Sequence, residues 1–261
     1  MRRTLLSIGW LAAITGCGPM VFTGGSPGTS SPAIASGDAL LNAMHNRYDT
    51  RWYRTITFVQ KSTYYRADGS ILRAETWYEA GQFPGRLRID MGEPSRGNGI
   101  LYRADSVYQI QSGRITDRRL DNNELLTLGF DVYAQPQYRT ADRLRRKGFN
   151  LAILHNDSLD GRRMYVVGAA KGDSTTNQFW IDAERLLFVR ALMTQAGRTR
   201  DIRFERYTQY ATGWVAEEVR VLAGGRMAFH EEYSQVRVND PLDDNLFVPE
   251  RWSSATHWYR P

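Results

Sequence analysis

The sequence of 261 residues contains a single cysteine, Cys17. No disulfide can form within the chain, so the fold has to be stabilised by packing of a hydrophobic core. Lysine is also scarce, because the basic residues are arginines with three exceptions, Lys61, Lys147 and Lys171. Basic residues outnumber acidic ones by 34 to 28, yet no block of five or six like charges occurs. Charge spread in this way does not indicate a nucleic-acid groove, and we expect no nucleic-acid partner.

Signatures of catalysis and metal binding are missing as well. The sequence has no phosphate-binding loop and no dinucleotide fingerprint. Adjacent glutamates occur at 217–218 and 231–232, but neighbours along a strand point to opposite faces, so neither pair forms a catalytic dyad. Four histidines are scattered without the spacing of metal ligands: His45, His155, His230 and His257. We therefore expect a protein that is not an enzyme and has no catalytic residue, no metal site and no cofactor.

Long apolar runs are also absent, since no segment reaches the roughly 20 apolar residues that span a bilayer. The first apolar stretch, Leu5 to Ile14, follows Arg2 and Arg3, which is the layout of a signal peptide. The next residues, Ile14-Thr15-Gly16-Cys17, resemble the bacterial lipobox, where cleavage precedes a cysteine that carries diacylglycerol. We expect a signal peptide at 1–16 and lipidation of Cys17. The alternatives are an ordinary signal with an incidental cysteine, and twin-arginine export.

The residues after Cys17 have the composition of a linker. Gly18 to Gly37 carry no charge and consist mainly of Gly, Ser, Pro and Thr. Twenty residues of this kind span about 25 Å, so a folded domain can stand clear of a membrane and stay near it. We assign 17–37 to the lipidated cysteine and linker, 38–250 to the folded domain and 251–261 to a C-terminal tail.

The periodicity after the linker changes from helical to extended. Asp38 is placed to cap a first helix with Leu40, Leu41, Met44 and Tyr48 on one face. Strands then follow from Trp52 onward, separated by turn signals such as Asp68-Gly69 and Asp160-Gly161. A helical insertion begins near Asp121 and Glu124, which resemble a capping box, and ends at Gly148. Consecutive hairpins predict a mainly β (α+β) fold, with about 11 antiparallel strands in one curved sheet or barrel.

Two segments of the chain resemble a known family. The first is NQFWIDAERLLFVRALM, at 177–193, and the second is VRVNDPLDDNLFVPERW, at 236–252. Both are similar to the periplasmic lipoprotein carriers LolA and LolB, and to their relatives, the amino-terminal domain of RseB and the mycobacterial lipid-binding lipoproteins. The resemblance implies an open half-barrel whose concave face is covered by helices and holds acyl chains. Soluble LolA has no lipid anchor, so the predicted lipidation favours LolB or the lipid-binding lipoproteins.

Candidate site residues follow from the strand pattern and the resemblance. Arg54 is a candidate for the rim of the cavity or for holding its lid, and its alternative is a bulge or exposed end. For the cavity candidates the alternative is a closed hydrophobic core. For the lid candidates the alternative is a helix that simply packs on the domain. The cavity candidates are Trp52, Ile56, Phe58, Trp77, Leu87, Ile89 and Met91, and the lid candidates are Leu125, Leu128 and Val132.

The sequence thus predicts a bacterial envelope lipoprotein that faces the periplasm and is anchored through Cys17. Its expected ligand is an acyl lipid or the acyl chain of a lipoprotein, which it carries or accepts. Gly18 in place of an aspartate after the cysteine favours the outer membrane. The alternative is an interaction or sensor module that binds an envelope protein, as the RseB likeness implies, and an enzyme is the third reading.

Overall fold

The computed structural model describes residues 34–121 and 123–260. These residues belong to one compact unit. The predicted signal peptide, the predicted lipidation site Cys17 and most of the linker lie outside the described residues, so these assignments stay predictions.

The strands form a single antiparallel sheet of 13 members in the order β6-β5-β4-β3-β2-β1-β13-β12-β11-β10-β9-β8-β7. The prediction of a mainly β fold with one open curved sheet is confirmed, with 13 strands in place of about 11. The strands are β1 (Thr55–Tyr65), β2 (Ile71–Gln82), β3 (Arg86–Met91), β4 (Gly99–Arg103), β5 (Ser106–Gln111), β6 (Arg114–Leu120), β7 (Leu154–Leu159), β8 (Arg162–Val167), β9 (Gln178–Asp182), β10 (Phe188–Gln195), β11 (Arg198–Tyr210), β12 (Gly213–Ala223) and β13 (Arg226–Val238).

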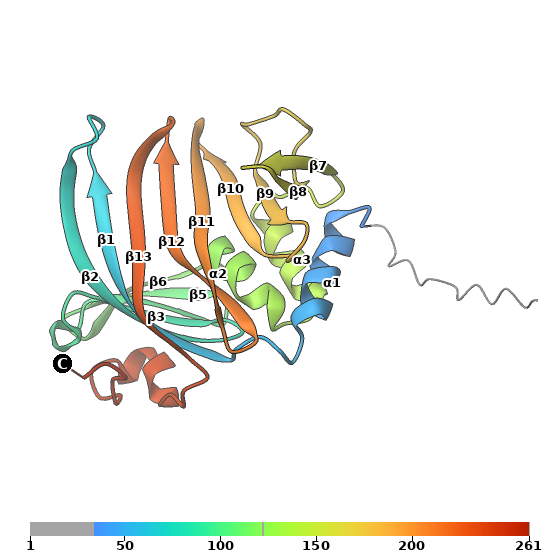
Figure 1. The fold of residues 1–261 in the computed structure, drawn as a ribbon. Coiled ribbons are helices and arrows are strands. Elements are labelled where there is room, and N and C mark those ends of the chain that lie inside the picture. Colours follow the sequence, from blue (N-terminus) through green and yellow to red (C-terminus); the bar gives the residue numbers. More distant parts are fainter. Residues whose placement is uncertain (1–33, 122, 261) are drawn as a thin grey trace, which may run out of the picture. The chain divides into compact units, whose positions relative to one another are not determined.

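The sheet is strongly curved, and β1 and β13 run side by side near its middle (Figure 1). Ile56 lies opposite Val238 and Tyr64 opposite Phe229, with a register shift between Thr57 and Val59. Every other pairing of the described sheet joins strands that follow one another in the chain. The result is two runs of hairpins, β1 to β6 and β7 to β13, joined at the β1–β13 seam.

The first helix, α1 (Gly37–Tyr48), buries the predicted residues Leu40, Leu41, Met44 and Tyr48. Its N-cap is Ser36, whose Oγ accepts the backbone N–H of Ala39, so the prediction that Asp38 caps this helix is wrong. An extended Ser36 places its short side chain over the first turn, which is the geometry that N-capping needs. Strand β1 begins only at Thr55, so Trp52 and Arg54 precede the first strand instead of sharing its face.

The helical insertion lies between β6 and β7 and consists of three pieces. They are α2 (Glu124–Gly129), the 3-10 helix η2 (Asp131–Tyr133) and α3 (Gln137–Arg146). Asn123, not Asp121, caps α2, because its Oδ1 accepts the backbone N–H groups of Leu125 and Leu126. These helices lie beside the β11–β10 half of the sheet (Figure 1), and their apolar residues join its main core cluster.

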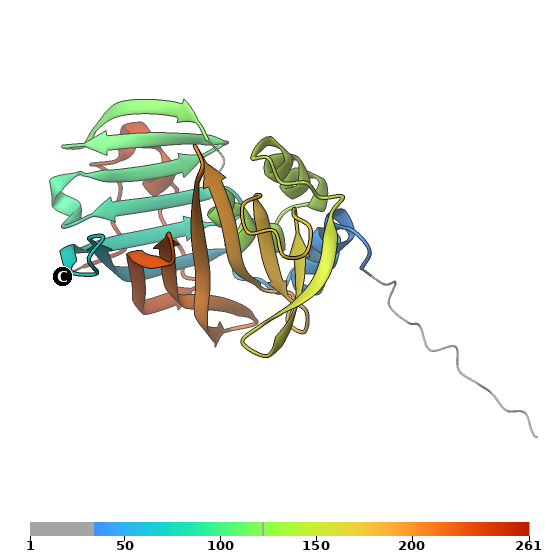
Figure 2. The ribbon, with the colours of Figure 1, turned by 90° about the horizontal axis from the view of Figure 1, so that it is seen from above.

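The main core lies on the concave face, where the helices pack against the sheet. A second cluster on the outer face combines Ala80, Leu101 and Ile110 with the segment after β13. That segment, which we call the C-terminal segment, spans residues 244–259 and contains η3 (Asp244–Phe247) and η4 (Pro249–Arg251). Figure 2 shows it behind β3 to β6, and most of the predicted tail belongs to it. Gly99 is required there, because a Cβ at this position would clash with the backbone oxygen of Ile89 and would meet the ring of Trp252 at 2.8 Å.

Candidate functional site

A lidded cavity of about 90 Å³ lies on the concave face of the sheet, beneath the helical insertion. We call residues 124–133, which contain α2 and η2, the lid. The cavity has 16 lining residues: Ile56, Phe58, Gln60, Trp77, Glu79, Phe83, Leu87, Ile89, Asn123, Leu125, Leu126, Phe130, Phe204, Val219, Glu231 and Tyr233. Most are aliphatic or aromatic, so the arrangement suits an apolar ligand.

Alternation along β1 places one wall of the cavity. Ile56, Phe58 and Gln60 share a face because side chains two residues apart in a strand point the same way. Across the sheet, Phe58 pairs with Glu79 of β2, while Gln60 pairs with Tyr233 of β13. The rings of Phe58 and Tyr233 are stacked, with centroids 4.2 Å apart. Three adjacent strands therefore present aromatic and carboxyl side chains to one space.

The lid contributes Leu125 and Leu126 from α2, together with Phe130 at its end. Phe130 stacks on Phe83, with ring centroids 4.8 Å apart. At the start of α2, Lys147 pairs with Glu124 at 3.1 Å. The apolar contacts and this partly exposed ion pair hold a helix of only six residues over the cavity.

The other end of the lid is anchored more firmly, through Asp131 and Tyr133. Asp131 is fully buried and accepts hydrogen bonds from the backbone N–H of Gly85 at 2.8 Å and from Arg143 at 2.7 Å. Burial raises the pKa of Asp131 to about 6, although both partners oppose the shift. The hydroxyl of Tyr133 accepts the backbone N–H of Phe188 in β10. Residues 131–133 are therefore fixed to both halves of the sheet.

Two carboxyl groups lie within the cavity, on Glu79 and Glu231, and we call them the carboxyl pair. Glu79 is 5% exposed, and among the described residues its carboxyl has no hydrogen-bond partner. Burial, and then repulsion from Glu231, raise the pKa of Glu79 well above its ordinary value. Burial raises the pKa of Glu231 to about 7, against hydrogen bonds from Tyr233 and Gln60. The Tyr233 hydroxyl donates to Glu231 Oε2 at 2.8 Å.

The predicted site residues fall into two groups. Ile56, Phe58, Trp77, Leu87, Ile89 and Leu125 line the cavity. The others lie elsewhere: Leu128 and Val132 are fully buried in the main core, and Met91 packs against it from the end of β3. Trp52 stacks on Tyr133, with ring centroids 3.9 Å apart, in an aromatic cluster outside the cavity lining.

Arg54 is exposed and contacts the insertion just beyond the lid. Its Nη1 donates to the carbonyl of Ala134 at 3.4 Å, which is a long hydrogen bond. Its backbone N–H donates to the side chain of Asn239, and its carbonyl accepts from Phe83. The backbone of Arg54 thus fixes the entry to β1, while its side chain touches the connection between η2 and α3.

Several lining residues were not anticipated from the sequence, chiefly Gln60, Glu79, Phe83, Glu231 and Tyr233. Strand alternation alone extends Ile56 and Phe58 to Gln60, and Trp77 to Glu79. The signal for Gln60 and for Glu79 was the same: each is a polar residue at the next position of an otherwise apolar strand face. No local signal places Glu231 near Glu79, because their approach depends on the β1–β13 pairing.

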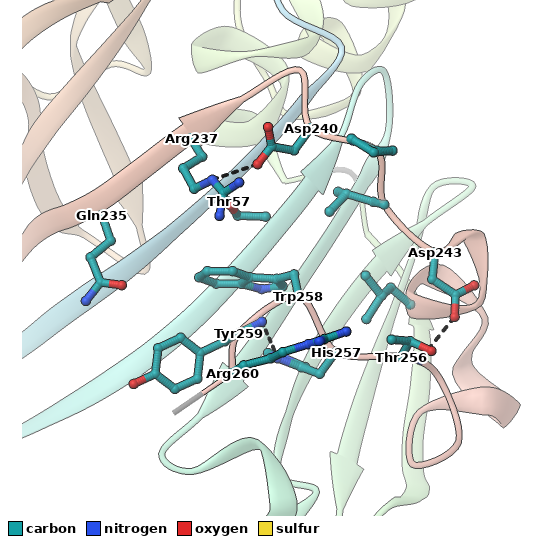
Figure 3. Close-up of a pocket in the computed structure, with 13 residues that line it drawn as sticks. Thr57, Gln235, Arg237, Asp240, Asp243, Thr256, His257, Trp258, Tyr259 and Arg260 are labelled. Atoms are coloured by element: carbon teal, nitrogen blue, oxygen red, sulfur yellow. Dashed lines mark hydrogen bonds and ion pairs between the residues drawn. The ribbon is translucent and has the colours of Figure 1, made fainter.

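A second hollow of about 560 Å³ lies on the outer face, between the end of β13 and the C-terminal segment. Figure 3 shows some of its polar groups paired with one another. Arg237 pairs with Asp240 at 2.7 Å, and Asp243 accepts the backbone N–H of Thr256. The concave cavity is the stronger candidate for a ligand site, because its lining is mostly apolar and a short helix covers it.

Within residues 34–121 and 123–260, no group of three or more His, Cys, Asp or Glu side chains is placed to hold a metal ion. Among the same residues no helix combines the length and apolar character that a bilayer crossing needs.

No protein-family model and no curated protein matches this sequence. Solved structures match over most of the chain. A LolA superfamily protein from Nitrosomonas europaea is 12% identical, covers 82% of this chain and 97% of its own, and gives a TM-score of 0.54. A domain ascribed to outer membrane lipoprotein sorting, from Vibrio parahaemolyticus, gives 13% identity, coverage of 82% and 97%, and a TM-score of 0.55.

A DUF1329 family protein from Desulfovibrio piger is also similar, with 16% identity, coverage of 81% of this chain and 95% of its own, and a TM-score of 0.54. At these identities the likeness concerns the fold. The chain has the LolA-like fold, which confirms at this level the resemblance seen in the two sequence segments.

Proposed function

We propose that this protein is a bacterial envelope lipoprotein that holds an acyl chain, of a lipid or of a lipoprotein, in the cavity beneath the lid. It acts as carrier or acceptor, and no catalytic step is involved. The observation that carries the proposal is the apolar cavity under a short helix on a LolA-like sheet. Lipidated Cys17 anchors the protein to a membrane on its periplasmic side, with the outer membrane favoured.

Burial of an acyl chain supplies enough free energy for such a role. A palmitoyl-sized chain has about 15 methylenes at roughly 0.8 kcal/mol each, so full burial contributes on the order of 10 kcal/mol before the costs of ordering. An apolar lining is sufficient for this, and 12 of the 16 lining residues are aliphatic or aromatic when Tyr233 is included.

The cavity has to enlarge to accept such a chain. Its 90 Å³ is well below the roughly 300–1,000 Å³ of typical ligand sites. The lid is the element suited to move, because its buried hydrogen bonds concentrate at Asp131 and Tyr133, while α2 is held by apolar contacts and by the partly exposed Lys147–Glu124 ion pair. We propose that α2 swings away about Phe130 when the acyl chain enters.

A charge on the lid tests this proposal. The full chain is used, with Cys17→Ser in every variant so that lipidation plays no part, and displacement of a fluorescent fatty acid is measured beside urea unfolding. Leu125 lines the cavity and is only partly buried, so Leu125→Asp should weaken binding at least tenfold and leave the urea midpoint nearly unchanged. Leu120→Asp is the matched control, since Leu120 is 84% exposed and lies outside the cavity.

Equal binding by both variants argues against the lidded cavity as the acyl site. If the unsubstituted protein binds neither a fatty acid nor a neutral amphiphile of similar chain length, such as dodecanol, the carrier function is wrong. The interaction module that binds an envelope protein then becomes the better reading of this fold.

A further inference from the structure

The cavity has a charge character opposite to that of the whole chain. Arg and Lys outnumber Asp and Glu by 34 to 28 in the sequence, yet the 16 lining residues include two glutamates and no basic residue. A cavity meant for a fatty acid alone gains nothing from buried carboxyl groups, since they repel its headgroup and cost desolvation.

Glu79 is the group that lacks a partner. It is 5% exposed, lines the cavity and accepts no hydrogen bond from the described residues. Glu231 faces the same space and already accepts from Tyr233 at 2.8 Å. A buried carboxyl without a partner is costly, and the penalty is relieved by a ligand that brings hydrogen-bond donors or a positive charge.

Aromatic rings surround the carboxyl pair. Trp77 lies two residues before Glu79 on the same face of β2, and Phe58 lies opposite Glu79 on β1. Tyr233 stacks on Phe58 at 4.2 Å. Carboxylates set among tryptophan, tyrosine and phenylalanine rings form the environment that binds ammonium groups, through charge and through cation–π attraction.

We propose that the cavity binds amphiphiles whose polar end is a protonated amine, with the ammonium group at Glu79 and Glu231 and the alkyl chain along the apolar walls. This inference rests on the proposed function, because it uses the same cavity and the same opening of the lid. It makes the site selective against carboxylate- and phosphate-headed chains. No charged residue of the lid lines the cavity, since the lining residues of the lid are Leu125, Leu126 and Phe130.

Three amphiphiles of equal chain length test the proposal: dodecylamine, dodecanol and dodecanoate. Each displaces a neutral fluorescent probe, N-phenyl-naphthylamine, from the full chain carrying Cys17→Ser. We expect dodecylamine to bind at least about tenfold more tightly than dodecanoate, as hydrogen bonds to charged groups would give. The Glu79→Gln/Glu231→Gln variant should lose that preference, while keeping its affinity for dodecanol within a few-fold.

The matched control is Glu232→Gln. Glu232 neighbours Glu231 but lies outside the cavity lining and pairs with Lys61 at 3.0 Å, so its substitution should keep the amine preference. Urea unfolding of each variant shows that a loss of preference does not come from a loss of fold. Equal affinity for all three amphiphiles, or a preference that survives in the double variant, overturns this inference and leaves the acyl-binding function standing. If no amphiphile displaces the probe, both fail.

Discussion

The guanidinium carbon of Arg88 lies 3.8 Å from the ring centroid of Trp252, so a buried arginine of β3 stacks on the C-terminal segment. Arg88 also donates to the carbonyl of Trp252 at 3.1 Å and pairs with Asp90 at 2.7 Å, and both charged side chains are at most 3% exposed. His257 contacts Asp90 from the same segment. The outer face of the sheet is thus closed by residues that follow its last strand.

Breaking this ion pair should destabilise the whole domain. Asp90→Asn leaves Arg88 buried without a charged partner, which typically costs about 3–5 kcal/mol. Urea unfolding measures the loss. Asp244→Asn is the control, because Asp244 pairs with Arg86 at an exposed site and should cost less than about 1 kcal/mol. Equal effects of the two substitutions would mean that the outer-face ion pair adds little.

Removing the ring of Phe58 should enlarge the cavity at the expense of stability. Phe58→Ala is expected to cost about 3–5 kcal/mol, since the side chain is 1% exposed and stacks on Tyr233. Added fatty acid should recover part of this loss, because a ligand that binds only the folded state stabilises it. Phe247→Ala, in the outer-face cluster, should lose as much and recover no more than the unsubstituted protein. Thermal unfolding with and without ligand compares the two.

Stability should fall as the pH rises through the neutral range. Glu231 has its pKa raised from 4.5 to about 7, and Glu79 is shifted in the same direction, so the folded state binds these protons more tightly than the unfolded chain does. Their contribution is complete below about pH 4.5 and is lost as the pH approaches and passes about 7, by roughly 1–3 kcal/mol.

The measurement is urea unfolding between pH 4.5 and 8. Glu79→Gln/Glu231→Gln should flatten the curve, leaving the smaller fall due to Asp131, whose pKa is raised to about 6. A free energy of unfolding that rises steadily over this range contradicts the raised pKa values of the carboxyl pair.

Lipidation of Cys17 remains a prediction from the sequence. Cys17→Ser should prevent diacylglyceryl transfer and leave the signal peptide uncut, because the signal peptidase of lipoproteins requires the modified cysteine. Labelled palmitate fed to cells should mark the unsubstituted protein alone. A mature amino terminus at another residue, or equal labelling of both proteins, rules the assignment out. Diacylglycerol supplies the two chains that stable anchoring needs.

Most of the strands could be predicted from the sequence, because turn signals and the alternation of apolar and polar residues are local features. It placed Ile56 and Phe58 on the cavity wall by their parity. It placed Trp52 on the same wall wrongly, because β1 begins only at Thr55 and Trp52 packs on Tyr133. The apolar run Leu125–Tyr133 predicted a lid, but its contacts depend on which side of the helix meets the sheet, so Leu128 proved to be core.

The proximity of Glu79 and Glu231 could not be predicted from any short stretch of the sequence. Glu79 and Glu231 face one space only because β1 lies between their strands, and a register shift near Thr57 sets which β13 residues share its face. Registers that include such a shift are fixed by the whole sheet, so no short window of sequence reveals them.

The pairing of β1 with β13 also determines when, during synthesis of the chain, the sheet can be completed. Thr55 begins the first strand and Val238 ends the last, so two neighbouring strands of the cavity wall, β1 and β13, come from opposite ends of the sheet's sequence and pair only after almost all of the domain has been synthesised. Contacts so distant along the chain form slowly, because the entropy of closing a large loop is lost before these contacts stabilise the fold. While the chain is still incomplete, the hairpins made first therefore present an unfinished sheet with an open edge at β1, which is the kind of surface that chaperones shield and that other unfinished chains can join.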